Sequence, residues 1–285
     1  MEKMLSNPHF KVVRFYQKSS EVFDNVDIKG GVAIGYYDAN SDFGPIGFFS
    51  EYAELKSIVK KVLSHESFID GGLADIISSQ GIYRFSELAL REQPLILKVQ
   101  GKGTAAKIVS SSVEKLPTVF LADKPADASD YIQILGRINN QRGYRWIRRD
   151  YIQPVESLDY WKVLVPEANG TGAIGEVLST PVIGTPVIGH TDTFLSIGKF
   201  SSQEEATACL KYVQSKFARC LLGTLKATQH NPAATWAHVP LQDFTAKSDI
   251  NWLQPVADIN RQLYAKYSLT QEEIAFIESM IKPMS

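Results

Sequence analysis

Cysteine is scarce in this sequence, with only Cys209 and Cys220 among 285 residues. They lie eleven residues apart in one predicted helix, a spacing that places both on the same face. We therefore expect two core thiols in a reducing compartment rather than a disulfide or half of a zinc site. The five histidines are scattered, and neither an HxxxH nor a CxxC pair occurs. A metal site is therefore not expected.

Long apolar runs and an excess of one charge are also missing. No stretch of eighteen apolar residues occurs, so we predict no membrane-spanning helix. The first residues, MEKMLSNPHFKVV, lack the continuous apolar stretch of a secretion signal, and we expect a cytoplasmic protein. The net charge of −1 excludes a uniformly basic coat for nucleic acid but allows a local basic patch.

The pattern of apolar residues predicts strands first and helices at the end. Strands are expected at 10–16, 31–37, 94–99, 118–123, 131–138, 144–152 and 161–165, and between 176 and 200. Helices are expected at 51–64, 201–226, 255–267 and 271–282. Capping boxes are predicted for Ser202 with Glu205 and for Thr270 with Glu273. The chain is therefore predicted to be α+β, with β-rich lobes and a helical C-terminal end.

One glycine motif has the spacing of a dinucleotide-binding turn. NGTGAIGE, residues 169–176, contains the pattern GxGxxG after an apolar strand. Such a turn binds pyrophosphate only if a helix follows, because the helix N-terminus supplies free N–H groups. Here Pro181 and Pro186 follow among β-branched residues, which exclude a helix. We interpret the motif as a flexible turn between strands.

Two other short motifs allow an enzymatic interpretation. SNPHF, residues 6–10, differs at His9 from the NPPF/NPPY signature of amino-group methyltransferases, but no strands precede it to build a cofactor site. A terminal loop is the favoured interpretation. Asp27-Ile28-Lys29 matches the D-x-K half of a magnesium nuclease site, which also needs an acid from a neighbouring strand. A divergent magnesium-dependent restriction endonuclease therefore stays open as an alternative.

The strongest chemical signal is the basic segment RINNQRGYRWIRRDYI, residues 137–152. No acid occurs before Asp150, and aromatic residues are interleaved with the arginines. Arginine binds phosphate as a fork and pairs with guanine, and asparagine pairs with adenine in the same bidentate way. The alternative is a solvated strand whose arginines neutralise nearby carboxylates. The candidate DNA contacts in this segment are Arg137, Asn139, Asn140, Arg142, Arg145, Arg148 and Arg149.

A second polar segment follows the long predicted helix. Lys226, Gln229, His230 and Asn231 lie in LKATQHNPAATWAHVPLQDFT, residues 225–245. Lys226 and Gln229 are the candidate DNA contacts here. The alternative is a turn that only connects the helix to the next segment.

Several stretches are similar to a known family. SSEVFDNVDIKGGVAIGYYDAN (19–40) resembles the last strands of the catalytic domain in adenine-N6 DNA methyltransferases of restriction–modification systems. The branch concerned has a TaqI-like C-terminal specificity domain and includes fused type II restriction–methylation enzymes. KFARCLLGTLKATQHNP, HVPLQDFTAKSDINW and ADINRQLYAKYSLTQEEIAFIESMIKPM resemble the closing segments of the same family.

The resemblance implies a target-recognition half with a stub of the catalytic half. Residues 1–45 would be terminal strands of the methyltransferase domain, and residues 46–285 would be a mixed-sheet DNA target-recognition domain. A division of that domain into two lobes near residues 165–200 is left open. By the same resemblance, Phe23 takes the place of an aromatic beside the flipped adenine, and Lys29 lies near it.

No complete catalytic site is expected in this chain. The family's motifs for S-adenosylmethionine and for the target base would lie upstream of Phe23, so no cofactor is expected here. The expected partners are double-stranded DNA and a separate catalytic methyltransferase half. The strands at 10–16 and 31–37 should then expose apolar edges. A further alternative is an interaction subunit that binds a catalytic partner more than DNA.

Overall fold

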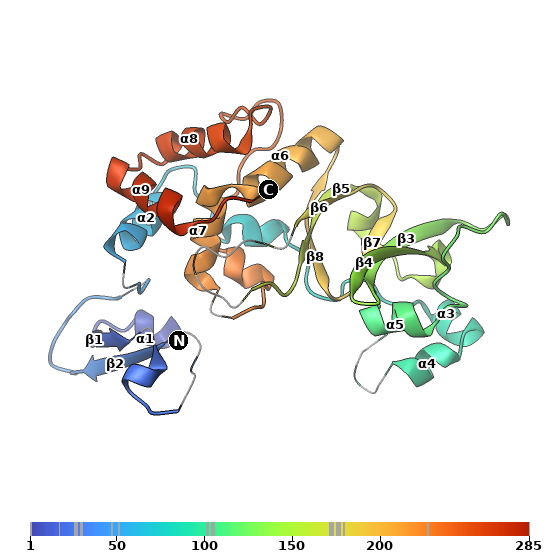
Figure 1. The fold of residues 1–285 in the computed structure, drawn as a ribbon, viewed down its shortest axis with the longest axis horizontal. Helices are drawn as coiled ribbons and strands as arrows, with labels where there is room; N and C mark the ends of the chain where they lie inside the picture. The colour runs from blue at the N-terminus through green and yellow to red at the C-terminus, as the bar shows by residue number, and fades with distance from the viewer. Residues whose placement is uncertain are drawn as a thin grey trace.

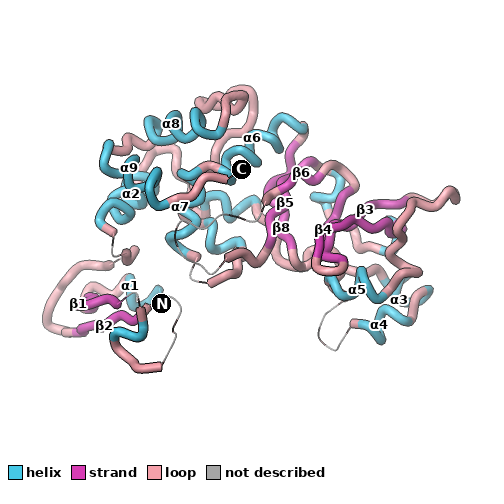
Figure 2. The backbone as a smooth tube through the Cα atoms, in the orientation of Figure 1, coloured by secondary structure: helices cyan, strands magenta, loops and turns pink. Residues whose placement is uncertain are grey.

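The computed structural model is an elongated arrangement of three parts (Figure 1). It describes residues 2–16, 18–25, 28, 31–46, 48–50, 52–100, 103, 106–170, 174, 178, 180–226 and 228–284. An N-terminal hairpin lies at one end, a helical lobe lies above and beside it, and a β-rich lobe lies at the other end. In Figure 2 the strands lie in three places: the N-terminal hairpin, the middle of the molecule and the β-rich lobe. None of the described helices has the length and apolar character needed to cross a membrane.

The N-terminal part is a two-stranded antiparallel sheet beside a short helix. Helix α1 (Glu2–Leu5) precedes β1 (Phe10–Tyr16), which pairs with β2 (Val32–Tyr37) and contains an irregularity in register between Val12 and Arg14. The 3-10 helix η1 (Ser19–Glu21) lies between the strands. Both predicted strands are therefore confirmed.

The β-rich lobe is built on a three-stranded sheet with the order β4-β3-β7. Its strands are β3 (Tyr131–Ile138), β4 (Gln141–Arg148) and β7 (Ile188–His190), and its helices are α3 (Glu87–Glu92), α4 (Leu95–Val99) and α5 (Ser110–Lys115). One core cluster runs from Tyr83 to Leu158 and contains Ile134 and Ile147, which are fully buried. This core fixes one face of the β3–β4 hairpin.

The helical lobe covers a second three-stranded sheet, with the order β6-β5-β8. The strands are β5 (Trp161–Pro166), β6 (Val182–Gly184) and β8 (Phe194–Phe200); the helices are α2 (Ala53–Leu63), α6 (Gln203–Gln214), α7 (Lys216–Leu225), α8 (Val256–Lys266) and α9 (Gln271–Met280). Four 3-10 helices complete the two lobes: η2 (Gly72–Ile76), η3 (Arg149–Tyr151), η4 (Glu156–Asp159) and η5 (Ala233–Trp236). Leu55, Val163 and Phe217 belong to one core, which joins α2, the sheet and the C-terminal helices.

Two predicted strands are wrong. Residues 95–99 form α4, in which Ile96 is buried while Leu95 and Leu97 are exposed. A short apolar run does not distinguish a helix from a strand, because both can bury it. Residues 118–123 form a turn in which the N–H groups of Val119 and Phe120 donate to the Leu116 carbonyl, and only Leu121 pairs with β4.

The long helix predicted over residues 201–226 is two helices. Ser215 ends α6 in an extended conformation, and its hydroxyl accepts from the Ala218 N–H to begin α7. Cys209 and Cys220 are both buried free thiols, as expected, but they lie in different helices. The break lets each helix pack its own apolar face.

Of the two predicted capping boxes, one is confirmed. Thr270 and Glu273 each accept from the other's backbone N–H at the start of α9. At α6 the Ser202 hydroxyl accepts from the Glu205 N–H, but the Glu205 carboxylate accepts from Ser201 instead. The α+β class and the helical C-terminal end are confirmed.

Candidate nucleic-acid interface

The β3–β4 hairpin presents its two faces to different surroundings. The antiparallel register pairs Ile132 with Ile147, Leu135 with Tyr144, and Arg137 with Arg142. Successive side chains alternate between faces, so the isoleucine pair lies in the β-rich core while the other two pairs share the opposite face. On that face Leu135 packs against the neighbouring sheet. Beyond Leu135, toward the turn, the face carries exposed arginines.

Asn139 and Asn140 form the two-residue turn of this hairpin. Both have positive φ, 49° and 61°, as a type I′ turn requires. Asparagine tolerates this conformation better than other residues with a Cβ, so the backbone alone explains these two identities. The Asn139 N–H donates to Glu114 at 2.7 Å, and both side chains are exposed. Their amides remain available to a ligand.

Arg148 and Arg149 are ion-paired. Arg148 lies 3.1 Å from Glu92 and 2.5 Å from Asp150, and it sits over the Tyr151 ring. Hydrogen bonding to Asp150 is the main reason that the pKa of Arg148 is raised. Arg149 contacts Asp130 at 3.7 Å and is also paired with Asp159. For these two arginines the interpretation as neutralisers of nearby carboxylates describes the observed contacts.

Arg137 and Arg142, which we call the arginine pair, have different surroundings. They are direct cross-strand neighbours, and in the described part of the chain neither is ion-paired with a carboxylate. Arg137 donates to the Asn140 carbonyl at 3.2 Å. Arg142 donates to the Thr180 carbonyl and lies 5.5 Å from the centre of the Phe194 ring.

The charge of the arginine pair is therefore not neutralised by the contacts observed. Partial burial lowers the pKa of Arg142, the neighbouring Tyr144 opposes this, and the positive charge of Arg137 lowers it further. Like charges directly opposite on two strands destabilise a sheet. The pair thus forms a local positive site that an anion would stabilise.

Arg145 differs both from the ion-paired Arg148 and Arg149 and from the arginine pair. It shares its face of β4 with the buried Ile147, and its guanidinium donates to the Tyr144 carbonyl at 2.9 Å. It is half-buried, and no carboxylate among the described residues is ion-paired with it. The basic segment is therefore not one continuous stripe, because Arg142 and Arg145 lie on opposite faces of β4.

The segment after α7 is anchored to the end of β5. Lys226 is buried, and its ammonium donates to the Asn169 carbonyl at 2.6 Å. The Gln229 side chain is exposed, while its carbonyl accepts from the Asn169 N–H at 2.6 Å. His230 contacts Glu167 at 2.9 Å. The burial of Lys226 is a physical reason to leave it out of a solvent-facing DNA surface.

The remaining candidate residues are placed only in part. Phe23 follows η1 and is 49% exposed, with its N–H donating to the Ser19 carbonyl at 2.8 Å. Lys29 and Asp27 lie outside the described residues, as do Gly172 and Gly175 of the glycine motif. Within the part that is described, no group of three or more His, Cys, Asp or Glu side chains could hold a metal ion.

Comparison with known proteins found no family model that matches this chain and no curated protein that is similar to it.

Proposed function

We propose that this chain is the DNA target-recognition region of an adenine-N6 methyltransferase of a restriction–modification system, or of a fused restriction enzyme. The observation that carries this proposal is the arginine pair, an exposed positive site beside Tyr144 at the end of the β3–β4 hairpin, where the two strands extend beyond their pairing with β7. The resemblance of residues 19–40 and of the C-terminal segments to that family supports the same conclusion.

The shape of the hairpin suits duplex DNA. The major groove admits a two-stranded ribbon, and side chains at its tip then reach the base edges. Arg137 and Arg142 would bind backbone phosphates, which would relieve their mutual repulsion. Asn139 and Asn140 at the turn would lie closest to the bases, where an amide pairs with adenine in a bidentate manner. Phosphate contacts would fix the register and the turn would read sequence.

The catalytic step would belong to a partner. A methyltransferase that acts on adenine must rotate the base out of the duplex, which costs a few kcal/mol, and a separate domain holds the DNA meanwhile. S-adenosylmethionine and most of the base pocket would be supplied by the catalytic half. We expect this chain alone to bind S-adenosylmethionine no better than background, and stoichiometric micromolar binding in a calorimeter would contradict that.

Two double variants test the proposal: one removes the arginine pair, and the other is a matched control. Arg137→Ala with Arg142→Ala should weaken binding to any duplex and reduce the slope of log K against log salt by about two. The matched control, Arg148→Ala with Arg149→Ala, removes the same formal charge from arginines that already have acidic partners. It should change the slope less. Equal losses in both variants, or none in the first, would overturn the assignment.

A second candidate function is an interaction subunit that binds a catalytic protein. The N-terminal hairpin favours it, because Val13, Ile34, Tyr36 and Tyr37 are 62%, 45%, 48% and 58% exposed. An isolated two-stranded sheet is marginally stable at best, and its edges can pair with another chain. Tight binding to a catalytic half without salt-sensitive DNA binding would select this function over the first. Both functions are compatible with one chain.

A further inference from the structure

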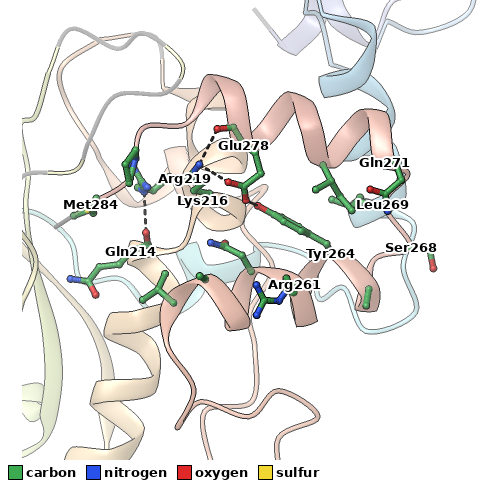
Figure 3. Close-up of a pocket in the computed structure, with 16 residues that line it drawn as sticks. Gln214, Lys216, Arg219, Arg261, Tyr264, Ser268, Leu269, Gln271, Glu278 and Met284 are labelled. Carbon is green, nitrogen blue, oxygen red and sulfur yellow. Dashed lines mark hydrogen bonds and ion pairs between the residues drawn. The ribbon is translucent and has the colours of Figure 1, made fainter.

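A groove lies between α7, α8 and α9 in the helical lobe, far along the chain from the β3–β4 hairpin. Its volume is about 930 Å³. Figure 3 shows polar side chains from all three helices around it. The charged members of its lining are Lys216, Arg219, Arg261 and Glu278. Nothing in the proposed function uses this groove, so its role is a separate question.

Arg219 is the unusual member of this lining. It is only 3% exposed, in a helix whose neighbouring residues Phe217, Ala218 and Cys220 are apolar and buried. Its Nε donates to the Gln214 carbonyl at 3.2 Å and its Nη2 donates to the Lys282 carbonyl at 2.7 Å. Its Nη1 is buried and has no hydrogen-bond partner.

These contacts leave the charge of Arg219 without a counter-ion. Both acceptors are neutral carbonyls, and no described carboxylate is ion-paired with the guanidinium. Burial lowers the pKa of Arg219 to about 10, so the group is still charged at neutral pH. An unpaired buried charge is among the costliest features of a folded chain. Such a group indicates an anion that the described residues of the chain do not supply.

The other charged groups of the lining do not supply that anion. Glu278 accepts from Lys216 at 2.6 Å through one carboxylate oxygen and from the Tyr264 hydroxyl at 2.8 Å through the other. The dashed lines in Figure 3 trace this network. Arg261 is paired with Asp258. Among the described residues, the lining therefore contains three cationic side chains and one carboxylate, and that carboxylate is already bonded through both oxygens.

The remainder of the lining is largely apolar. Hydrocarbon surface comes from Val256 and Ala257 in α8, Leu269 just before α9, Ile274 in α9, and Met284. A ligand that fits both parts must combine an anionic head with an apolar body. A bare inorganic ion would satisfy Arg219 but would leave this surface uncovered.

We propose that this groove binds a small organic anion, whose carboxylate or phosphate accepts from Arg219 and whose apolar body lies along α8. Convergent polar groups in a largely apolar concave site are the usual architecture of a small-molecule site. Arg219 is the specificity-determining residue, because its Nη1 has no hydrogen-bond partner and would donate a charge-assisted hydrogen bond to an oxyanion.

Calorimetry with phenyl phosphate, benzoate and uncharged benzamide tests the proposal on the full chain. At least one of the two anions should bind with one-to-one stoichiometry, and benzamide should bind at least about tenfold more weakly than that anion. Arg219→Gln should weaken binding of the anion by about tenfold or more, while Arg219→Lys should retain part of the affinity. Saturable binding of neither anion, or equal binding by a folded Arg219→Gln variant, would overturn the proposal.

A second variant tests the proposal even if the Arg219 variants do not fold. Ala257 is exposed on α8 and lines the groove, so Ala257→Trp should fill the space without touching the buried core. This variant should fold normally and lose the anion. Unchanged anion binding by Ala257→Trp would place the ligand elsewhere and would overturn the assignment, even if no Arg219 variant can be purified.

Discussion

Replacing Arg137 by glutamine should stabilise the folded chain, although it removes a charged side chain from a surface strand. Arg137 lies directly opposite Arg142, and the described residues place no ion-paired carboxylate on either. Like charges in this geometry destabilise a strand pair by about 0.2–1 kcal/mol. Since Arg137 is exposed to solvent, we expect a gain in the lower part of that range, about 0.2–0.5 kcal/mol. Glutamine also keeps a donor for the Asn140 carbonyl.

The matched control is Arg148→Gln on the partner strand, β4. This change breaks the contacts with Glu92 at 3.1 Å and with Asp150 at 2.5 Å, so it should destabilise the chain by about 0.5 kcal/mol or more. Both substitutions remove a guanidinium group, Arg137→Gln from β3 and Arg148→Gln from β4. They should nevertheless change the free energy of unfolding in opposite directions, because only one of the arginines has acidic partners.

Urea denaturation at low salt measures both effects. The urea midpoint should rise for Arg137→Gln and fall for Arg148→Gln. The slope of the unfolding free energy against urea concentration should stay unchanged. About 0.5 M salt should shrink both differences, since it screens exposed charges over a few ångströms. A loss of stability in Arg137→Gln equal to that in Arg148→Gln would show that the arginine pair is compensated, and the case for a phosphate site would fail.

Three further changes test other parts of the structure. Burial lowers the pKa of His190 to about 4, below its ordinary 6.5, so the unfolded chain binds the proton more readily. The stability of the folded chain should therefore fall as the pH drops from about 6.5 toward 4. His190→Asn should remove part of that pH dependence in urea titrations. Thr270→Ala breaks the α9 capping box and should cost about 1 kcal/mol, whereas an unchanged urea midpoint would contradict that. Deleting residues 1–40 should leave a soluble chain that binds DNA but cannot pair, through the edges of β1 and β2, with a second copy or a catalytic half in sedimentation experiments. Unfolding would instead show that the hairpin is part of the core.

The sequence predicted those elements whose signals are local. Helix α2 follows from the apolar spacing of Leu55, Ile58 and Val62, all buried in the core. The strands on either side of Asn139 and Asn140 follow from runs of β-prone residues, but the bounds of the second were wrong: the prediction was 144–152, whereas β4 is Gln141–Arg148 and a 3-10 helix follows it. By contrast, the break at Ser215 was missed, because the apolar pattern continues across it and only the backbone of the folded chain changes direction there.

The chemical environment of individual side chains could be predicted less well. Arg148 pairs with Glu92, which lies more than fifty residues away in sequence, and Arg149 pairs with Asp159. Spacing in the sequence therefore could not distinguish these two arginines from the arginine pair. Lys226 is buried by a contact with Asn169 from another element. Arg219 did leave a local signal, since it is the one charged residue after Lys216 in the apolar helix KFARCLLGTL. A lone charge in such a helix indicates a buried group that needs a partner.

The most direct test of the central proposal is the salt dependence of duplex binding by the unmodified chain. Fluorescence anisotropy with labelled duplexes of varied sequence would give log K against log salt. We expect a linear decrease with a slope of about −0.9 for each phosphate contacted, hence about −2 or steeper if the arginine pair binds two phosphates. A slope near zero, or no binding to any duplex at low salt, would contradict a role in DNA recognition.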